Sequence, residues 1–281
     1  FGPIEIVDQV PAAVSAAFHL QDFDGDGNVN LVSFEGREAG FFQRDRHAGR
    51  WEGFRTFQGL PRVDFANARV QWVDLNGDGH PDLIVDHHDS FAWYPSDGPR
   101  GFGTHVVLAK PDATGGGAPT LVQDRALQTF FAEMNGDGLV DMVRVQNGRV
   151  EYWPNLGQGK FGRGVLMEDA PVIDAFGELD ADRIRFVDLD GSGNAALLYL
   201  GRGEIRYWLN QSGNRFGPEV RLPNLPYIDL LSSAQVFDFL GDGSRCLVWS
   251  TPLPTRESQA IQYLRLTDAV PPRMLLTVAN S

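Results

Sequence analysis

The chain has few of the features that define several common protein classes. Cys246 is the single cysteine among 281 residues, so no disulfide can form within the chain. No apolar run approaches the roughly 20 residues that a membrane-spanning helix needs. Lys110 and Lys160 are the only lysines, and the formal net charge is −13. Such a surface repels phosphate backbones and anionic lipids, so nucleic acid and membrane surfaces are disfavoured as partners.

Patterns associated with catalysis are also missing. The sequence contains no Gly-x-Ser-x-Gly elbow, no phosphate-binding loop and no Cys-x-x-Cys pair. These motifs mark particular nucleophiles, nucleotide sites and redox centres. The sequence therefore supports no specific enzyme class, and we expect a binding module rather than an enzyme.

A short acidic loop recurs five times along the chain. The copies, which we number as loops 1 to 5, are DFDGDG (22–27), DLNGDG (74–79), EMNGDG (133–138), DLDGSG (188–193) and DFLGDG (238–243). Their first residues are separated by 74 − 22 = 52, 133 − 74 = 59, 188 − 133 = 55 and 238 − 188 = 50 positions. A repeat of this length indicates a propeller, a solenoid or another array.

An aromatic-Gly step supports the same period. It follows three of the loops, at Phe102-Gly103, Phe161-Gly162 and Phe216-Gly217. Its offset from the first loop residue is constant, because 102 − 74 = 28, 161 − 133 = 28 and 216 − 188 = 28. In the first copy, Trp51 lies one position beyond this offset, counted from Asp22. We expect the fourth strand of each unit to begin at this step.

Short segments of strand character lie between these motifs. Alternating segments such as 183–188 lead into the loops, apolar runs such as 197–200 follow them, and aromatic segments such as 205–208 come third. Strands with period two, bounded by Gly, Asn and Pro and without long helical patterns, give four strands per unit. The sequence therefore predicts an all-β fold, a β-propeller of four-stranded antiparallel blades that forms one domain over residues 1–281.

The two ends of the chain predict how the ring closes. Residues 1–6 resemble residues 216–221, which follow an aromatic-Gly step. The fifth unit lacks that step, because position 238 + 28 = 266 is Leu266. We therefore expect the N-terminal strand to complete the fifth blade, which removes exposed sheet edges. A sixth blade is the alternative, because the tail at 273–279 also has strand character.

The acidic loops are candidate Ca²⁺ sites. Oxygen atoms at alternate positions of a tight turn converge on one point, where Ca²⁺ takes six to eight oxygen ligands. Side chains at positions 1, 3, 5 and 9 would supply them, with a backbone carbonyl at position 7. The predicted ligands are Asp22, Asp24, Asp26 and Asn30 in loop 1, Asp74, Asn76, Asp78 and Asp82 in loop 2, and Glu133, Asn135, Asp137 and Asp141 in loop 3.

Loops 4 and 5 have incomplete ligand sets. Ser192 and Ala196 replace two ligands of loop 4, and Leu240 and Cys246 replace two of loop 5. We expect both loops to lack metal. Asn-Gly and Asp-Gly pairs also form tight turns without any ion, so all five loops could be purely structural.

Aromatic pairs recur on the third segment of three units, at 93–94, 152–153 and 207–208. Adjacent residues of a strand point to opposite faces of the sheet. We therefore expect one member of each pair to pack between blades. The other members leave open an exposed aromatic row that could stack on sugar rings.

The loop, its apolar strand and the aromatic-Gly step resemble FG-GAP and VCBS repeats. A narrower resemblance covers nearly the whole chain. The segments 152–162, 180–193, 208–216 and 240–250, and the ending at 272–277, are similar to the B component of bacterial insecticidal toxin complexes, the Tc toxins. The string LNQSGN at 209–214 is the most specific of these matches.

The resemblance to Tc toxins implies a function. In that family the B and C components form a hollow shell around a toxic enzyme. The B propeller, usually described as six-bladed, docks on the channel-forming A component and gates the exit of the enzyme. The resemblance thus implies a secreted toxin complex, with this chain as a fragment of a longer polypeptide and with the A component and the rest of the shell as partners.

Two other functions stay open at the level of the sequence. The first alternative is a calcium-dependent lectin or adhesin, whose propeller would bind glycans in pockets between blades. The second is a purely architectural segment of a large surface protein. Glycan binding that is lost in chelator would favour the lectin, whereas binding only to an A component would favour the toxin module.

Overall fold

The computed structural model describes most of the chain. The described residues are 3–7, 10–11, 18–34, 39–45, 50–61, 63–64, 70–87, 89–111, 128–175, 178–201, 203–224, 233–250 and 261–267. Within them the only helices are two single 3₁₀ turns, η1 (Gly98–Arg100) and η2 (Ala181–Arg183). Neither has the length and hydropathy that crossing a membrane requires.

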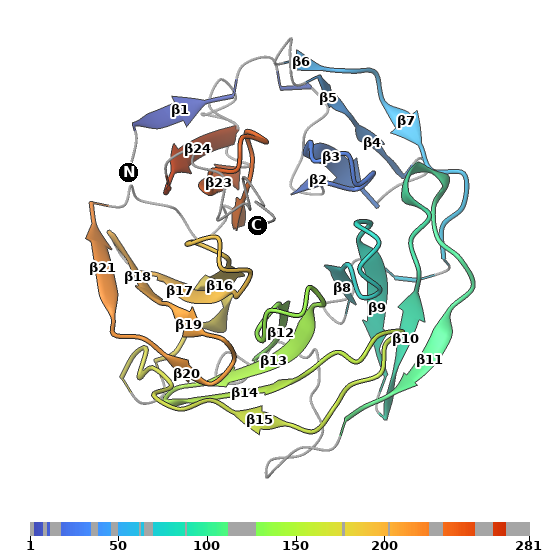
Figure 1. Cartoon of the computed structure of the whole chain (residues 1–281). Helices are drawn as coiled ribbons and strands as arrows, with labels where there is room; N and C mark the ends of the chain where they lie inside the picture. The colour runs from blue at the N-terminus through green and yellow to red at the C-terminus, as the bar shows by residue number, and fades with distance from the viewer. Residues whose placement is uncertain are drawn as a thin grey trace, which may run out of the picture.

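Five four-stranded antiparallel sheets are arranged as blades around a central axis (Figure 1). From the axis outward, blade 1 consists of β2 (Phe18–Gln21), β3 (Asn30–Ser33), β4 (Gly40–Phe42) and β7 (Arg55–Thr56). Blade 2 consists of β8 (Val70–Val73), β9 (Asp82–Asp86), β10 (Ser90–Tyr94) and β11 (Val106–Ala109). Blade 3 consists of β12 (Gln128–Ala132), β13 (Asp141–Gln146), β14 (Arg149–Trp153) and β15 (Val165–Leu166).

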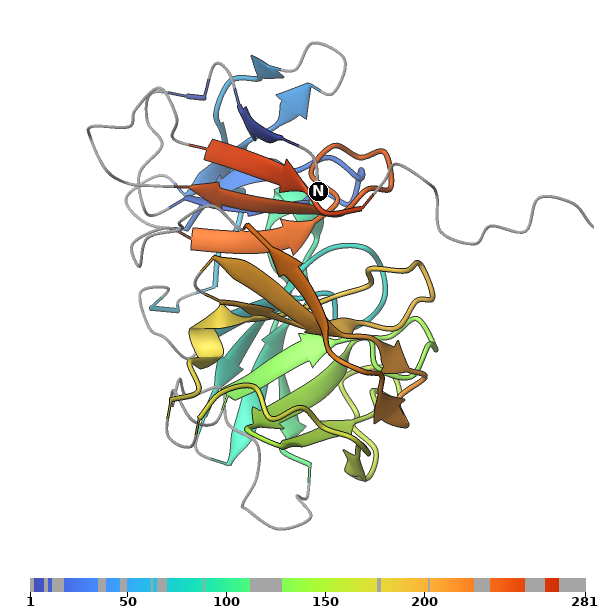
Figure 2. The same ribbon diagram turned by 90° about the vertical axis from the view of Figure 1, so that its left-hand side faces the viewer.

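The last two blades follow the same plan. Blade 4 consists of β16 (Ile184–Val187), β17 (Ala196–Leu200), β18 (Glu204–Trp208) and β21 (Val220–Pro223). Blade 5 consists of β22 (Ser233–Phe237), β23 (Cys246–Ser250), β24 (Ile261–Arg265) and β1 (Ile4–Ile6). Figure 2 shows the ring from its side, with blades 4 and 5 nearest the viewer. The prediction of an all-β propeller with five blades is confirmed, whereas the tail at 273–279 lies outside the described residues.

The N-terminal strand β1 lies where the sequence predicted it. It is the outer strand of the last sheet, and it pairs antiparallel with β24 in the register Ile4↔Leu264 to Ile6↔Gln262. The amide of Val7 extends this ladder by donating to the carbonyl of Ile261 at 3.1 Å. Blade 5 therefore combines the N-terminal strand with the last three described strands, and its core side chains pack against Val29 of blade 1.

The aromatic-Gly step differs from the prediction. It does not begin the fourth strand. Instead its aromatic residue pairs with the chain just after the third strand, as in Ser96↔Phe102, Asn155↔Phe161 and Asn210↔Phe216. The glycine amide then donates to the carbonyl of the residue that directly follows the third strand, for example from Gly162 to Pro154 at 2.7 Å. In blade 1 the corresponding pair is Arg44↔Trp51, between β5 (Arg44–Asp45) and β6 (Arg50–Trp51).

The packing of the aromatic residue explains why the chain closes a loop between the third and fourth strands. Its aromatic side chain packs toward the preceding blade, as Phe216 does in the core shared by blades 3 and 4. The outer strand then starts a few positions later, for example at Val165 or Val220. In blade 4 the loop is regular enough to form a ribbon of β19 (Asn210–Gln211) and β20 (Arg215–Phe216).

Among the described residues the hydrophobic core consists of five clusters, one between each pair of neighbouring blades. The cluster between blades 1 and 2 is aromatic. Phe34 stacks on Trp72 with their ring centroids 3.9 Å apart, and Phe23 meets Phe102 edge-on at 5.8 Å. Because every blade shares its core with both neighbours, no blade can bury its apolar faces alone.

Candidate functional site

The acidic loops join the first and second strands of each blade, so all five lie on the same face of the ring. Each loop has glycine at positions 4 and 6. In loop 2, Gly77 and Gly79 have φ values of 79° and 87°, which L side chains rarely adopt. These glycines let the loop turn tightly enough for its amides and carboxylates to face inward.

Loops 2 to 5 are closed by their own hydrogen bonds. In loop 2, one oxygen of Asp74 accepts the amides of Gly77 at 2.8 Å and Asp78 at 3.1 Å, and the other accepts that of Gly79 at 2.8 Å. The first carboxylate of loops 3, 4 and 5 likewise accepts three amides; these residues are Glu133, Asp188 and Asp238. The first carboxylate of each of these four loops thus holds the turn through backbone amides, which gives it a structural role whether or not an ion binds.

Loop 1 is organised differently. Ligand atoms of Asp22, Asp24 and Asp26 all lie within 4.8 Å of one another, which no other group of acidic, histidine or cysteine residues achieves in the described chain. Asp22 accepts the amide of Gly27 at 3.0 Å through Oδ2. The Oδ1 atoms of Asp22 and Asp24 are buried and accept no hydrogen bond. Loop 1 thus brings three carboxylates together, and two of their oxygens lack a hydrogen bond of ordinary geometry.

The charges of loop 1 repel one another. Burial raises the pKa of Asp24 from 3.8 to about 6, and the neighbouring charges of Asp26 and Asp22 act in the same direction. Burial is also the main reason that the pKa of Asp22 is raised. Nearby donors act on these groups in the opposite direction. The amides of Gly25 and Asp26 lower the pKa of Asp22. The side chain of Asn30 likewise lowers that of Asp24. A divalent cation would remove this repulsion and supply the missing partner of both Oδ1 atoms.

The ninth position of the loops has a structural role. Asp82 and Asp141 are fully buried, and each places one oxygen on the loop and one on the chain after the third strand. Asp141 accepts the amides of Met134 at 3.0 Å and Asn155 at 2.8 Å. Asp82 accepts those of Leu75 at 3.1 Å and Ser96 at 2.7 Å, and also the Trp93 indole at 2.8 Å. The predicted ligand oxygens at this position already hold the loop to the blade.

Burial raises the pKa of both carboxyl groups, of Asp82 to about 6 and of Asp141 to about 7. Asn30 takes this place in loop 1, with Oδ1 accepting the amide of Phe23 at 2.6 Å. Its Nδ2 atom is buried without a partner. In loop 5 the position belongs to Cys246, which is buried in the core between blades 5 and 1.

A second set of contacts, which sequence reasoning missed, fastens loops 2, 3 and 5 to the next blade. Asn155 of blade 3 donates to the carbonyl of Leu75 in loop 2 at 2.9 Å, and Asn210 of blade 4 donates to that of Met134 in loop 3 at 2.9 Å. Arg44 of blade 1 donates to the carbonyl of Phe239 in loop 5 at 3.1 Å, which links the last blade to the first. Both asparagines lie at the same distance in sequence from the ninth loop position of their own blade, because 155 − 141 equals 210 − 196. This spacing could have revealed the contact.

The central channel is a second candidate site. It contains a cavity of about 780 Å³, which is lined by the inner strand of every blade. Aromatic side chains from four of these strands contribute; they are Trp72, Phe130, Phe131, Phe186 and Phe237. Two polar contacts cross between inner strands, from Gln71 to the carbonyl of Thr129 at 3.0 Å and from Arg185 to that of Ala234 at 2.7 Å.

The recurrent aromatic pairs pack mostly into the core. Trp93, Trp153 and Trp208 are buried, and so is Tyr152. Tyr94 and Tyr207 are half-buried. The described third strands therefore present no row of fully exposed aromatic rings.

Sequence and structure comparisons agree with this geometry. The FG-GAP-like repeat family matches residues 22–85, which hold loops 1 and 2 and the strands around them. The chain is therefore a β-propeller that carries an FG-GAP-like repeat. Its fold is similar to part of the Photorhabdus luminescens Tc holotoxin pore, at 27% sequence identity and a TM-score of 0.65 over 95% of this chain. No curated protein matches the sequence.

Two further structures share the fold. TcdB2-TccC3 without its hypervariable C-terminal region is 20% identical, with a TM-score of 0.63 over 94% of this chain. A lectin of Agrocybe aegerita, solved to explain recognition of non-reducing terminal N-acetylglucosamine, is 17% identical, with a TM-score of 0.50 over 83% of this chain and 59% of its own. The chain spans only 12% and 15% of the two Tc toxin chains.

Proposed function

We propose that this chain is the docking and gating propeller of a Tc-type toxin B component. In this role it binds the channel-forming A component and controls the exit of a toxic enzyme from the shell, without being an enzyme itself. The observation that carries the proposal is the similarity to the Tc holotoxin pore, because it extends over 95% of the chain at 27% identity. The same proposal makes the chain a fragment of a longer polypeptide in an extracellular toxin complex.

The central channel supports a gating role. The cavity in this passage is surrounded by the inner strands of all five blades, so the packing of neighbouring blades sets its width. The contacts from Gln71 to Thr129 and from Arg185 to Ala234 tie inner strands of adjacent blades together next to the cavity. Opening the passage must separate such pairs, so the free energy of docking has to offset their loss.

Binding to an A component tests the docking role. The purified chain should bind an immobilised Tc A component saturably, while a glycan array run in parallel stays silent. An unrelated FG-GAP-like propeller serves as the control for non-specific adhesion. Glycan binding that disappears in chelator, without A-component binding, would contradict the proposal and identify a lectin.

We propose further that loop 1 binds Ca²⁺ through Asp22, Asp24 and Asp26. The support is the pair of buried Oδ1 atoms without a hydrogen-bond partner, which fits a cation with oxygen ligands. The ion would hold the loop rigid and take no part in a reaction. The ligand sets of loops 2 and 3 stay predictions, since their first carboxylates already accept amide hydrogen bonds.

Isothermal titration calorimetry should detect one Ca²⁺ per chain, and none for the variant Asp24→Ala. At a Ca²⁺ concentration about ten times Kd, the wild-type chain should gain about 1.4 kcal/mol of unfolding free energy. Asn76→Ala, at the same position of loop 2, is the matched control and should bind like the wild type. Two or three ions per chain would support sites in loops 2 and 3, whereas no binding to the wild type would refute the calcium proposal.

A further inference from the structure

The outer rim of the ring is apolar on some blades and charged on another. The nine exposed large apolar side chains of the described residues all lie on an outer strand or in the segment next to one; they are Ile4, Ile6, Phe54, Leu60, Val106, Val107, Leu156, Leu166 and Val172. Five of them belong to blades 2 and 3, and none belongs to the described part of blade 4. Apolar side chains grouped on one surface indicate a contact site.

On blades 2 and 3, several of these side chains border the same interface between two blades. Val106 lies opposite Trp93, on the face of blade 2 that packs against blade 3. Leu166 lies opposite Glu151, on the face of blade 3 that packs against blade 2 through Trp153. The loop that carries Leu156 rests on β11, because Gly159 of that loop contacts Leu108. Val107 lies on the same edge strand as Val106, and its side chain points to the other face. We call Val106, Leu156 and Leu166, together with Val107, the rim patch.

Strand β11 has an open edge without a charged residue. It consists of Val106, Val107, Leu108 and Ala109, and it pairs only with β10 among the described strands. Exposed edges are usually protected by lysine, proline or short length. Lys110, directly after the strand, instead turns inward and pairs with Asp86 at 2.5 Å, both side chains being almost fully buried.

The other outer strands are protected in ways that β11 is not. Strands β7 and β15 have only two residues each, and β21 carries Arg221 and ends at Pro223. Strand β1 has three residues and contains Glu5, which accepts a hydrogen bond from Tyr263 at 2.5 Å. Among the described outer strands, β11 is therefore the one suited to contact with another strand or apolar surface.

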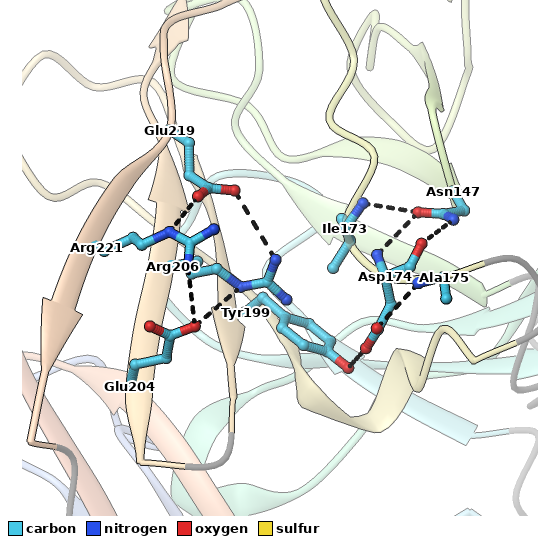
Figure 3. A network of polar contacts seen from close by, with 9 residues as sticks. All are labelled: Asn147, Ile173, Asp174, Ala175, Tyr199, Glu204, Arg206, Glu219 and Arg221. Atoms are coloured by element: carbon cyan, nitrogen blue, oxygen red, sulfur yellow. Dashed lines mark hydrogen bonds and ion pairs between the residues drawn. The ribbon is translucent and has the colours of Figure 1, made fainter.

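Blade 4 has a self-contained charged surface instead (Figure 3). Glu219 pairs with Arg221 at 2.6 Å and with Arg206 at 3.8 Å. Glu204 lies 3.7 Å from both of these arginines. These four charges neutralise one another, so this surface is suited to face water.

Exposed cations lie beside Leu156 of the rim patch in a chain of net charge −13. Lys160 and Arg163 are exposed on the same segment as Leu156, and within the described chain neither side chain forms an ion pair. The carboxylates of Glu168 and Asp169, which follow Leu166, instead pair with Arg215. An apolar centre with a basic border fits a partner surface that is apolar and carries carboxylates. A second copy that presents the same patch is a poorer match, because its basic border would meet an identical basic border.

We infer that the rim patch is the surface by which this propeller packs against the rest of a longer polypeptide, while the outer strand of blade 4 stays in solvent. The inference rests on the proposed function. Its support beyond the patch is that 94–95% of this chain matches only 12–15% of each Tc toxin chain, so the matched propellers belong to much larger bodies.

Cysteine labelling tests this inference, because Cys246 is buried and gives the 281-residue chain a low background. The native polypeptide without an added cysteine serves as its own blank. Val107→Cys and Leu156→Cys replace side chains that are 66% and 67% exposed. Arg221→Cys, whose side chain is 60% exposed on blade 4, is the control. Each variant is reacted with a maleimide in two forms, the 281-residue chain and the native polypeptide that contains it.

All three cysteines should react rapidly in the 281-residue chain. In the native polypeptide the two rim cysteines should react at least about tenfold more slowly, because the core of an interface excludes water. The control should react equally in both forms. Equal rates at the rim positions would overturn the inference. So would protection that needs added A component, or protection that rises with the concentration of the isolated chain, which would identify a second copy.

Failure of the rim inference is distinguishable from failure of the docking proposal. Binding of each native variant to the A component is measured separately, before labelling. Protected rim cysteines in a polypeptide that does not bind an A component would refute docking and support the rim contact. Rim cysteines that stay exposed in a polypeptide that binds the A component would refute the rim contact and support docking.

Discussion

Replacement of Glu151 by alanine should lower the free energy of unfolding by roughly 3–5 kcal/mol. Glu151 lies on β14 of blade 3, where it accepts a hydrogen bond from Arg144 at 2.6 Å. The two side chains are 1% and 4% exposed, so water cannot take the place of the lost carboxylate. The guanidinium of Arg144 also lies over the ring of Trp153, 5.1 Å from its centroid, and would keep its charge in an apolar environment.

The control for this prediction is an ion pair of the same length on the surface. Glu52 and Arg55 are also 2.6 Å apart, but their side chains are 44% and 53% exposed. Glu52→Ala should change the free energy of unfolding by less than about 1 kcal/mol, because solvent screens the pair. Urea unfolding followed by tryptophan fluorescence measures both variants. Equal losses would mean that burial does not set the strength of the Glu151 contact.

Spacing in the sequence was sufficient to predict the fold. Five acidic loops at a repeat of 50 to 59 positions gave five blades, and the missing aromatic-Gly step at Leu266 placed the N-terminal strand in the last sheet. These predictions succeed because a propeller repeats one unit, so each copy constrains the others. The aromatic-Gly step itself was misassigned, because a bridge and a strand start have the same local composition.

The candidate metal site was harder to predict. Loops 2 and 3 match the ligand pattern better than loop 1, yet only loop 1 combines three converging carboxylates with unsatisfied oxygens among the described residues. A sequence states which residues carry oxygen atoms, but it does not state which amides already occupy them. The third residue of each loop explains this difference. Asn76 and Asn135 donate to Asp78 and Asp137, whereas Asp24 has no hydrogen to donate when ionised.

The rim patch could not be predicted from composition either. Val106 and Val107 have the same strand character as the buried residues of neighbouring strands. Lys110 would be expected to protect the strand edge, but its inward position depends on the buried carboxylate of Asp86, which lies at the end of β9. Such contacts become visible only when the register between strands is known.

When a chelator is present, the free energy of unfolding should increase as the pH is lowered from 7 to 5. Burial raises the pKa of Asp141 from 3.8 to about 7, so between these values the folded state holds a proton that the unfolded state has released. The contribution of Asp141 to the free energy of unfolding is therefore complete below the pKa of the unfolded state. It is lost as the pH rises through the pKa of the folded state. For Asp141 the difference between pH 5 and pH 7 is roughly 2 kcal/mol. Asp82, with a pKa of about 6, adds to it in the same direction.

Two substitutions assign this pH dependence to the ninth loop position. Asp141→Asn removes the titrating group, so its urea midpoint should change less between pH 5 and pH 7 than that of the wild type. An asparagine side chain also presents one acceptor oxygen to the amides of Met134 and Asn155, whereas the ionised carboxylate presents two. Asn30 shows this arrangement naturally in blade 1, where Nδ2 has no partner.

Asn30→Asp is the reciprocal change, and it should make the pH dependence steeper by placing a buried carboxyl group in blade 1. If the urea midpoint changed equally with pH in the wild type and both variants, the ninth loop position would be excluded as the source of the pH dependence. Added Ca²⁺ then separates the two roles of the loops. An ion bound only in loop 1 should leave the contribution of Asp141 unchanged, because that carboxylate belongs to blade 3. An ion in loop 3 should remove it, since the cation favours the ionised carboxylate and lowers its pKa.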